Sequence, residues 1–284
     1  MLKSVFISIY IFSCIFSVGQ ASSSGYIVID DDSIFYETAG FGNVILLIHD
    51  GILHQEVWDD QFSFFSKDFK VIRYDRRGYG KSSPANGSYT HMDDLKTLYE
   101  QLEIDSAVLI ACSSGGALAI DFTIDYPQKV NGLVLVGAVV GGFSYTSHMS
   151  NRGGHLPESF ENDLEESIYY VTDDPYAIYF KNTDAKKRAV EMIKNYPQRV
   201  YTRQKYTRRV PPTYRRLNEI KTPTLILIGE FDIPDVHAHT GAINAGILQS
   251  RRLVLPNSGH IIPMEQPELF NETVMGFINS YISN

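Results

Sequence analysis

Short apolar runs recur along the chain and set the pattern of its secondary structure. Runs that are wholly or mostly apolar occupy residues 44–48, 71–74, 107–110, 133–136 and 224–228, and a shorter one lies at 252–255. A segment that is apolar at every position predicts a strand buried on both faces of a sheet. Stretches of helical pattern, such as 91–102 and 116–126, lie between these runs. The alternation predicts an α/β protein whose mostly parallel central sheet carries helices on both faces.

The strand–helix alternation is absent at two places. Residues 26–30 and 33–37 are short β-rich runs close together, which predict an opening hairpin. Between about residues 141 and 220 no comparable apolar run occurs, and prolines and many tyrosines favour several helices instead. We therefore predict a core at residues 22–140 and 221–284, with a helical cap inserted at 141–220.

The first 21 residues have the pattern of a secretory signal peptide. Lys3 precedes an apolar run at 4–18, and Gly19-Gln20-Ala21 supplies a small residue at the cleavage point. The run is shorter than the roughly 20 apolar residues of a membrane span. We predict cleavage after Ala21 and export, secreted or periplasmic, with no stable membrane span afterwards. An uncleaved membrane anchor and a lipid attached at Cys14 are the alternatives.

Composition and charge narrow the classes of partner. The chain has 284 residues, of which 44% are hydrophobic and 20% charged, as in a globular domain with an insertion. Its formal net charge of −8 argues against binding nucleic acid. Cys14 and Cys112, the two cysteines, do not have the spacing of a zinc site or a redox pair. His237 and His239 would point to different faces of a helix, so we expect no metal site there.

A candidate nucleophile lies where the predicted strand 107–110 runs into a helical pattern. The sequence Ala111-Cys112-Ser113-Ser114-Gly115 follows this strand. A tight turn between strand and helix would lift the hydroxyl of Ser113 above the sheet, and it requires small residues two positions before and after the serine. Ala111 and Gly115 meet this requirement. Ser114 is the alternative register, with Cys112 and Gly116 as the flanking small residues.

Two further strand ends supply an acid and a base. Asp232 follows the predicted strand 224–228, and His260 follows the strand 252–255. Polar residues beyond the carboxyl ends of parallel strands gather at one edge of a sheet. The order serine, aspartate, histidine therefore predicts a catalytic triad of Ser113, Asp232 and His260, with Glu230 and Asp235 as alternative acids.

The loop after the first long strand supplies the fourth part of the predicted site. Residues 49–51 read His-Asp-Gly directly after the strand 44–48. A backbone N–H in this loop and one from the residue after the nucleophile would bind an oxyanion. We predict Gly51 and Ser114 as the two donors of the oxyanion hole. His49 supports the loop in this interpretation, and a role as an alternative base stays open.

These motifs together resemble the α/β-hydrolase superfamily from about Tyr26 to the end of the chain. The segment 75–82, Asp-Arg-Arg-Gly-Tyr-Gly-Lys-Ser, is similar to the D-x-R-G-x-G-x-S turn of that family. The chain departs from the family pattern at Asp50 and Ala111, where glycine is common. The resemblance implies the α/β-hydrolase fold with an inserted helical cap, and a serine hydrolase that needs no cofactor.

The leading expectation for the activity is hydrolysis of a carboxylic ester, lactone or thioester of a small molecule, by a carboxylesterase-like serine esterase. His260 would activate Ser113, which forms an acyl-enzyme that water then releases. A carbon–carbon bond hydrolase or an enol-lactonase would use the same triad, and a binding protein of this fold with little turnover is a rival. The oligomeric state stays open.

Charge is unevenly distributed in the predicted cap. Its early part is acidic and its later part is rich in arginine, including Arg199, Arg203, Arg208, Arg209, Arg215 and Arg216. The simpler interpretation is a solvated cap whose halves neutralise each other. If arginines instead turned toward Ser113, the pocket would favour substrates that also carry a carboxylate.

Overall fold

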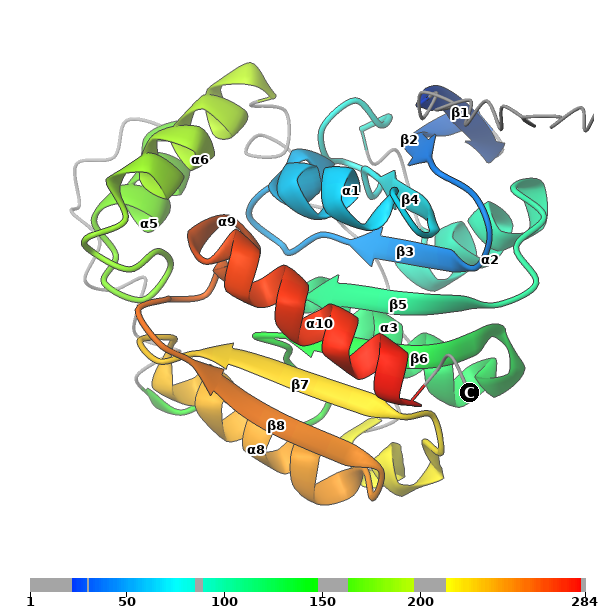
Figure 1. Ribbon diagram of the computed structural model, residues 1–284. Helices are drawn as coiled ribbons and strands as arrows, with labels where there is room; N and C mark the ends of the chain where they lie inside the picture. Colours follow the sequence, from blue (N-terminus) through cyan, green and yellow to red (C-terminus); the bar gives the residue numbers. More distant parts are fainter. Residues whose placement is uncertain (1–21, 30, 85–88, 148–162, 197–212, 282–284) are drawn as a thin grey trace, which may run out of the picture.

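An eight-stranded sheet forms the centre of the protein (Figure 1). The computed structural model describes residues 22–29, 31–84, 89–147, 163–196 and 213–281. The strand order is β1-β2-β4-β3-β5-β6-β7-β8. Their bounds are β1 (Ser23–Ile29), β2 (Asp32–Ala39), β3 (Val44–Ile48), β4 (Lys70–Tyr74), β5 (Ala107–Cys112), β6 (Val130–Val136), β7 (Thr224–Gly229) and β8 (Ser250–Leu255).

The pairing of the strands confirms the predicted α/β class. Every pair from β4 through β3, β5, β6 and β7 to β8 is parallel, whereas β1 pairs with β2, and β2 with β4, in antiparallel fashion. Each apolar run of the sequence lies within one of these strands, and the opening hairpin is β1 and β2. The strand ends extend beyond the apolar runs by up to three residues, since flanking residues such as Ser250 and Val130 still join the ladder.

Helices cover both faces of the sheet. On one face lie α2 (His91–Gln101), α3 (Ser114–Asp125) and α8 (Pro234–Gly246). On the other lie α1 (Asp59–Phe65), α9 (Ile262–Glu265) and α10 (Pro267–Tyr281), with the 3₁₀ turn η1 (Gln55–Trp58). A further turn, η2 (Pro127–Lys129), leads from α3 into β6.

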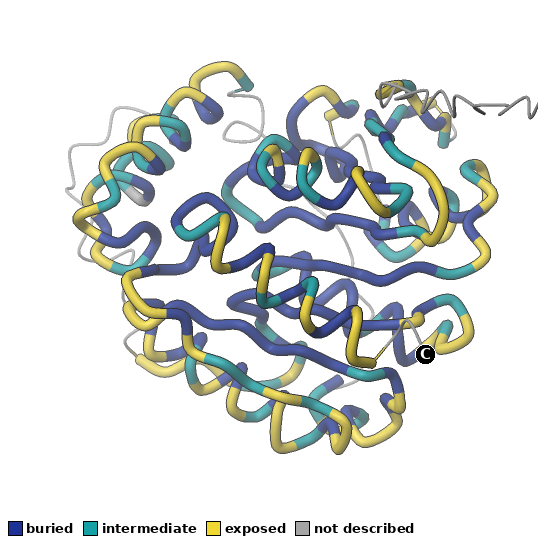
Figure 2. The backbone as a smooth tube through the Cα atoms, in the orientation of Figure 1, coloured by how far each residue is buried: buried dark blue, intermediate teal, exposed yellow. Residues whose placement is uncertain are grey.

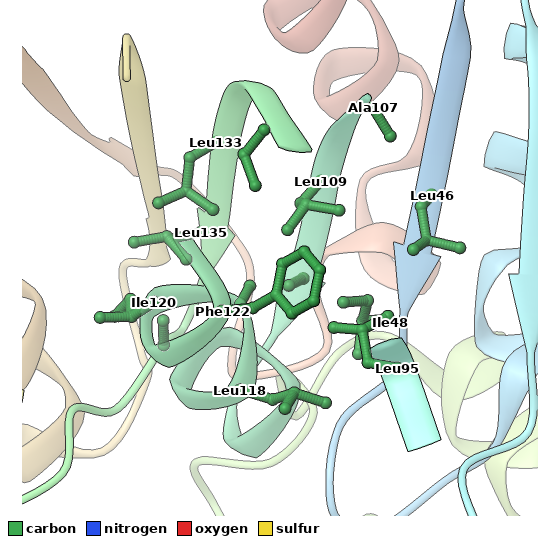
Figure 3. Close-up of a cluster of buried hydrophobic side chains, with 14 of the residues drawn as sticks. Leu46, Ile48, Leu95, Ala107, Leu109, Leu118, Ile120, Phe122, Leu133 and Leu135 are labelled. Carbon is green, nitrogen blue, oxygen red and sulfur yellow. The ribbon is translucent and has the colours of Figure 1, made fainter. Parts of the chain in front are cut away.

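Strand β3 illustrates why a strand inside the sheet is apolar at every position. Leu46 and Ile48 face one core cluster, together with Phe122 of α3 (Figure 3). Ile45 and Leu47 face the opposite cluster. Because successive side chains of a strand point to opposite faces, both sets are buried, as the dark tube of the inner strands shows (Figure 2).

The segment between β6 and β7 contains three helical elements in its described part. These are α5 (Asp163–Thr172), α6 (Thr183–Asn195) and the 3₁₀ segment η4 (Thr213–Glu219). Helices α5 and α6 lie beyond the end of the sheet to which the arrowheads of the parallel strands point (Figure 1). The segment η4 packs instead on α3 and α8. Two of these elements therefore lie at the carboxyl ends of the strands, where the predicted site residues also lie.

Candidate active site

The candidate nucleophile Ser113 is the single residue between β5 and α3. Its backbone has φ 53° and ψ −118°, in a region that L-residues rarely adopt and that costs roughly 1–3 kcal/mol. Its N–H donates to the carbonyl of Val136 at 2.8 Å, which fixes the turn to β6. Ser114 is already the first helical residue. This geometry favours the Ser113 register over the Ser114 register.

Close packing around this turn explains the small residues that follow the serine. A Cβ on Gly115 would lie 2.3 Å from the carbonyl oxygen of His49. One on Gly116 would lie 2.5 Å from the Cβ of Ala138. The motif by itself requires a small residue at position 115. The need for glycine at position 116 comes instead from the contact with Ala138, which follows β6.

The structure brings Asp232 and His260 into contact. The His260 Nδ1 lies 2.9 Å and 3.0 Å from the two carboxylate oxygens, and both side chains are buried, with relative exposures of 3% for Asp232 and 5% for His260. An Nδ1–H that donates to the carboxylate puts the lone pair of the neutral ring on Nε2, the nitrogen that can accept a proton. The alternative acids contact other groups: Glu230 accepts from the Asn257 N–H, and Asp235 accepts from Thr146.

Gly137 connects the Asp232–His260 pair with the nucleophile turn. Its φ is 51°, and a Cβ at this position would lie 3.0 Å from both Asp232 Oδ2 and His260 Nδ1. The preceding residue, Val136, accepts the backbone bond from Ser113. One short backbone segment therefore lies against the acid–base pair and beside the serine. The sequence did not indicate this role, since Gly137 belongs to none of the motifs.

The loop that carries His260 is held by the segment after α5. The His260 N–H lies 2.9 Å from the Tyr176 carbonyl and 3.0 Å from that of Ala177. Both carboxylate oxygens of Glu265 accept from the Gly259 N–H at 3.0 Å, and Oε2 also accepts from the Tyr179 N–H at 2.6 Å. Burial, and secondarily the nearby charge of Asp232, raises the pKa of Glu265 to about 7.

The predicted oxyanion loop and the nucleophile turn lie side by side. A Cβ on Gly51 would be 3.0 Å from the Ser114 Oγ. The loop is shaped by Asp50, whose Oδ1 accepts from the N–H groups of Ile52 at 2.5 Å and Leu53 at 2.8 Å. The N–H groups of Gly51 and Ser114 thus belong to adjacent segments, as a two-donor oxyanion hole requires.

His49 has both ring nitrogens engaged by the backbone. Its Nδ1 lies 2.8 Å from the Asp50 carbonyl, and its Nε2 accepts from the Arg76 N–H at 2.9 Å. Burial, with the charge of Arg76, holds the pKa of His49 well below its usual value. These contacts favour the supporting role over that of an alternative base.

Asp75 and Arg77 of the D-x-R-G-x-G-x-S turn play structural roles. Asp75 accepts from the N–H groups of Gln55 at 2.9 Å and Lys81 at 2.8 Å. Arg77 pairs with Asp94 through two nitrogens, at 2.7 Å and 3.2 Å, and also with Asp32. These contacts hold the turn between β1–β2, α2 and the loop after β3.

The described arginines in the later part of the predicted cap contact groups other than the triad. Arg216 pairs with Glu219 at 2.9 Å and with Asp125 at 3.3 Å, and Arg215 donates to the Tyr214 hydroxyl at 2.9 Å. Arg199, Arg203, Arg208 and Arg209 lie outside the described residues, as do residues 1–21 of the predicted leader. Within the described part of the chain, no helix is long and apolar enough to cross a bilayer.

The two histidines of α8 make separate contacts. His237 Nδ1 lies 3.1 Å from an Arg252 nitrogen, and His239 Nδ1 accepts from the Val140 N–H at 3.1 Å. Over the described ranges, no group of three or more histidine, cysteine or acidic residues is arranged to hold a metal ion.

Comparison with known proteins identifies the family. A bifunctional esterase/perhydrolase of Acinetobacter calcoaceticus is 26% identical, over 90% of this chain and 100% of its own. A 2-hydroxy-6-oxo-6-phenylhexa-2,4-dienoate hydrolase of Comamonas testosteroni is also 26% identical, over 88% of this chain and 92% of its own. The solved structure of an N-acyl homoserine lactone degrading enzyme superposes with a TM-score of 0.73 at 25% identity, covering 89% of this chain and 100% of that one. The family model of the alpha/beta hydrolase fold matches residues 43–267, and the chain belongs to that family.

Proposed function

We propose that this protein is a serine hydrolase that cleaves a carboxylic ester, lactone or thioester of a small molecule through an acyl-enzyme on Ser113. The observation that carries this proposal is the buried Asp232–His260 pair at 2.9 Å, beside a serine held at positive φ. Relatives with hydrolase names over nearly the whole chain support the reaction class.

The proposed mechanism follows from the positions of these groups. His260 Nε2 takes the proton of the Ser113 hydroxyl as its oxygen attacks the substrate carbonyl. The N–H groups of Gly51 and Ser114 stabilise the oxyanion of the tetrahedral intermediate. His260 then gives the proton to the departing alcohol or thiol. A water molecule, activated by the same histidine, attacks the acyl-enzyme and releases the acid, which restores Ser113.

Asp232 has a positioning role in this scheme. Its carboxylate keeps the proton of His260 on Nδ1 and stabilises the imidazolium that forms during attack. The Asp232 Oδ1 also accepts from the Ile233 N–H at 2.7 Å, so the carboxylate is itself oriented by the start of α8.

A carbon–carbon bond hydrolase is the second candidate, because the Comamonas relative is named as a dienoate hydrolase. A pocket for such an acid would use a cation for the carboxylate. Arg215 and Arg216, the two described arginines of residues 199–216, pair with other groups and so do not supply this cation. Rates with a neutral ester and an acidic analogue of equal length, in the wild type and in single Arg→Ala variants of 199–216, separate the two.

Fluorophosphonate labelling followed by peptide mapping tests the nucleophile directly. We expect the label on Ser113 and multiple turnovers of a short-chain p-nitrophenyl ester. The Ser114→Ala variant keeps the backbone N–H and is the matched control, which should still be labelled. Label on Ser114, or on neither serine, contradicts the assignment. Labelling without turnover across several acyl lengths would favour a binding protein of this fold.

A further inference from the structure

The guanidinium of Arg76 is buried beside the predicted oxyanion hole and has no acidic partner among the residues that the structure describes. The residue is 3% exposed. In the described part of the chain no carboxylate pairs with it, whereas its neighbour Arg77 pairs with Asp32 and Asp94. An unpaired buried cation is costly, so its retention requires compensating contacts or a function.

Among the described residues, the side-chain hydrogen bonds of Arg76 go to the two segments of the predicted oxyanion hole. Its Nη2 donates to the Asp50 carbonyl and, at 3.0 Å, to the Ser114 Oγ. Its guanidinium carbon lies 4.8 Å from the centre of the Tyr79 ring, in a cation–π arrangement. The Nε has no hydrogen-bond partner among the described residues. One nitrogen thus bridges the loop after β3 and the start of α3.

The Asp50 carbonyl belongs to the same peptide group as the Gly51 N–H. Since a peptide group is planar, a donor that fixes the carbonyl also fixes the direction of the N–H on its other side. Two donors act here, Arg76 Nη2 and His49 Nδ1, the latter at 2.8 Å. Hydrogen bonds to the carbonyl also polarise the peptide and strengthen its N–H as a donor.

We propose that Arg76 is a positioning residue that orients and polarises the oxyanion donor Gly51 N–H, and that its charge stabilises the negative oxygen of the transition state. The inference rests on the proposed function, because it assumes that an oxyanion forms next to Gly51 and Ser114. In a buried site a positive charge acts on a developing negative charge far more strongly than in water.

The proposal predicts that loss of Arg76 weakens stabilisation of the transition state and leaves substrate binding nearly unchanged. Removing one direct oxyanion donor typically lowers kcat by about 10²–10³-fold. Arg76 acts through the donors, so we expect Arg76→Met to lower kcat by about 10–10²-fold while KM changes less than about threefold. Arg76→Lys retains the charge and one donor nitrogen, and should recover part of the loss.

The experiment measures kcat per active site, which is counted by fluorophosphonate titration of each variant. A second readout is the affinity of phenylboronic acid, which forms a tetrahedral anion on the serine and should weaken in parallel with kcat. Arg216→Met is the matched control, since this half-buried arginine contacts Glu219 and Asp125 away from the site. Thermal unfolding reports whether each variant is folded.

The outcomes separate the inference from the function on which it rests. A wild-type protein without turnover and without a labelled serine refutes the proposed function, and the role of Arg76 with it. An active wild type whose Arg76→Met variant keeps kcat per site and boronate affinity overturns the inference alone. So does a variant whose lost activity is explained entirely by fewer active sites, because that pattern indicates a structural role.

Discussion

Gly137 allows a sharp test of the acid–base pair, because an added methyl group there would touch both members. The Gly137→Ala methyl would lie 3.0 Å from Asp232 Oδ2 and from His260 Nδ1, while ordinary contact begins at 3.4 Å. The backbone has little room to retreat, since the Gly137 N–H donates to the Leu227 carbonyl at 2.8 Å. The pair must therefore move by at least about 0.4 Å.

The Gly137→Ala substitution should lower both the stability of the fold and the catalytic rate, and each effect is measured separately. Alanine at φ 51° destabilises the fold by roughly 1–2 kcal/mol, which lowers the melting temperature by about 2–8 °C for a domain of this size. Displacement of the catalytic groups acts on the rate. Because a misplacement of about 1 Å can cost 10²-fold, we expect kcat to fall by about 10–10²-fold.

The matched control is Gly42→Ala. Gly42 has φ 88°, so its backbone strain is comparable, yet a Cβ there would meet only the Asp68 carbonyl oxygen at 4.0 Å. Both variants should lose stability, and only Gly137→Ala should lose kcat on a short-chain p-nitrophenyl ester. Wild-type kcat per labelled site in a folded Gly137→Ala protein would refute the placement of Asp232 and His260 in the catalytic machinery.

Three further outcomes can be checked. Ser113→Ala and His260→Ala should abolish ester hydrolysis, and Asp232→Asn should lower kcat by up to about 10⁴-fold. Cys112→Ala should retain substantial activity, because burial raises the pKa of that thiol. A folded but inactive Cys112→Ala variant would count against Ser113 as the nucleophile. Because the folded protein raises the pKa of Glu265 to about 7, the protonated carboxyl stabilises the fold, and this contribution is lost as the pH rises from about 4.5 to about 7. Over that range the free energy of unfolding of the wild type should decrease by up to about 3 kcal/mol more than that of Glu265→Gln. Parallel curves of the two proteins in urea unfolding would disprove this. Mass spectrometry of exported protein should give an N-terminus at Ser22, just before β1, and a retained leader would indicate an anchor.

Much of the fold could be predicted because the relevant signals are local in the sequence. Strands buried on both faces are apolar at every position, so β3 and β5 stand out without any knowledge of their partners. Asp232 follows such a run and His260 follows the shorter apolar run of β8, and parallel strands end at one edge of the sheet. Their contact was therefore foreseeable from the order of the elements alone.

The supporting residues could not be predicted, because their roles come from contacts between distant segments. Gly137 matters through Asp232 and His260, and Arg76 through the loop after β3. Arg76 also stands at a position that the turn motif leaves unspecified. Glu265 offered a weak signal, a lone acid between Pro263 and Pro267, but its contacts with Gly259 and Tyr179 depend on how α9 packs.

The strained turn at Ser113 makes a last prediction possible, which concerns stability rather than rate. Glycine adopts φ 53° and ψ −118° far more readily than alanine does. The relief of roughly 1–3 kcal/mol exceeds the roughly 0.4–1 kcal/mol that glycine loses through the greater entropy of its unfolded chain. Ser113→Gly should therefore be more stable than Ser113→Ala by about 1 kcal/mol, or about 2–4 °C, although both lack the nucleophile. Thermal unfolding of the two variants tests this prediction. If Ser113→Ala is at least as stable as Ser113→Gly, the turn carries no backbone strain. The physical argument for Ser113 over Ser114 as the nucleophile would then fail.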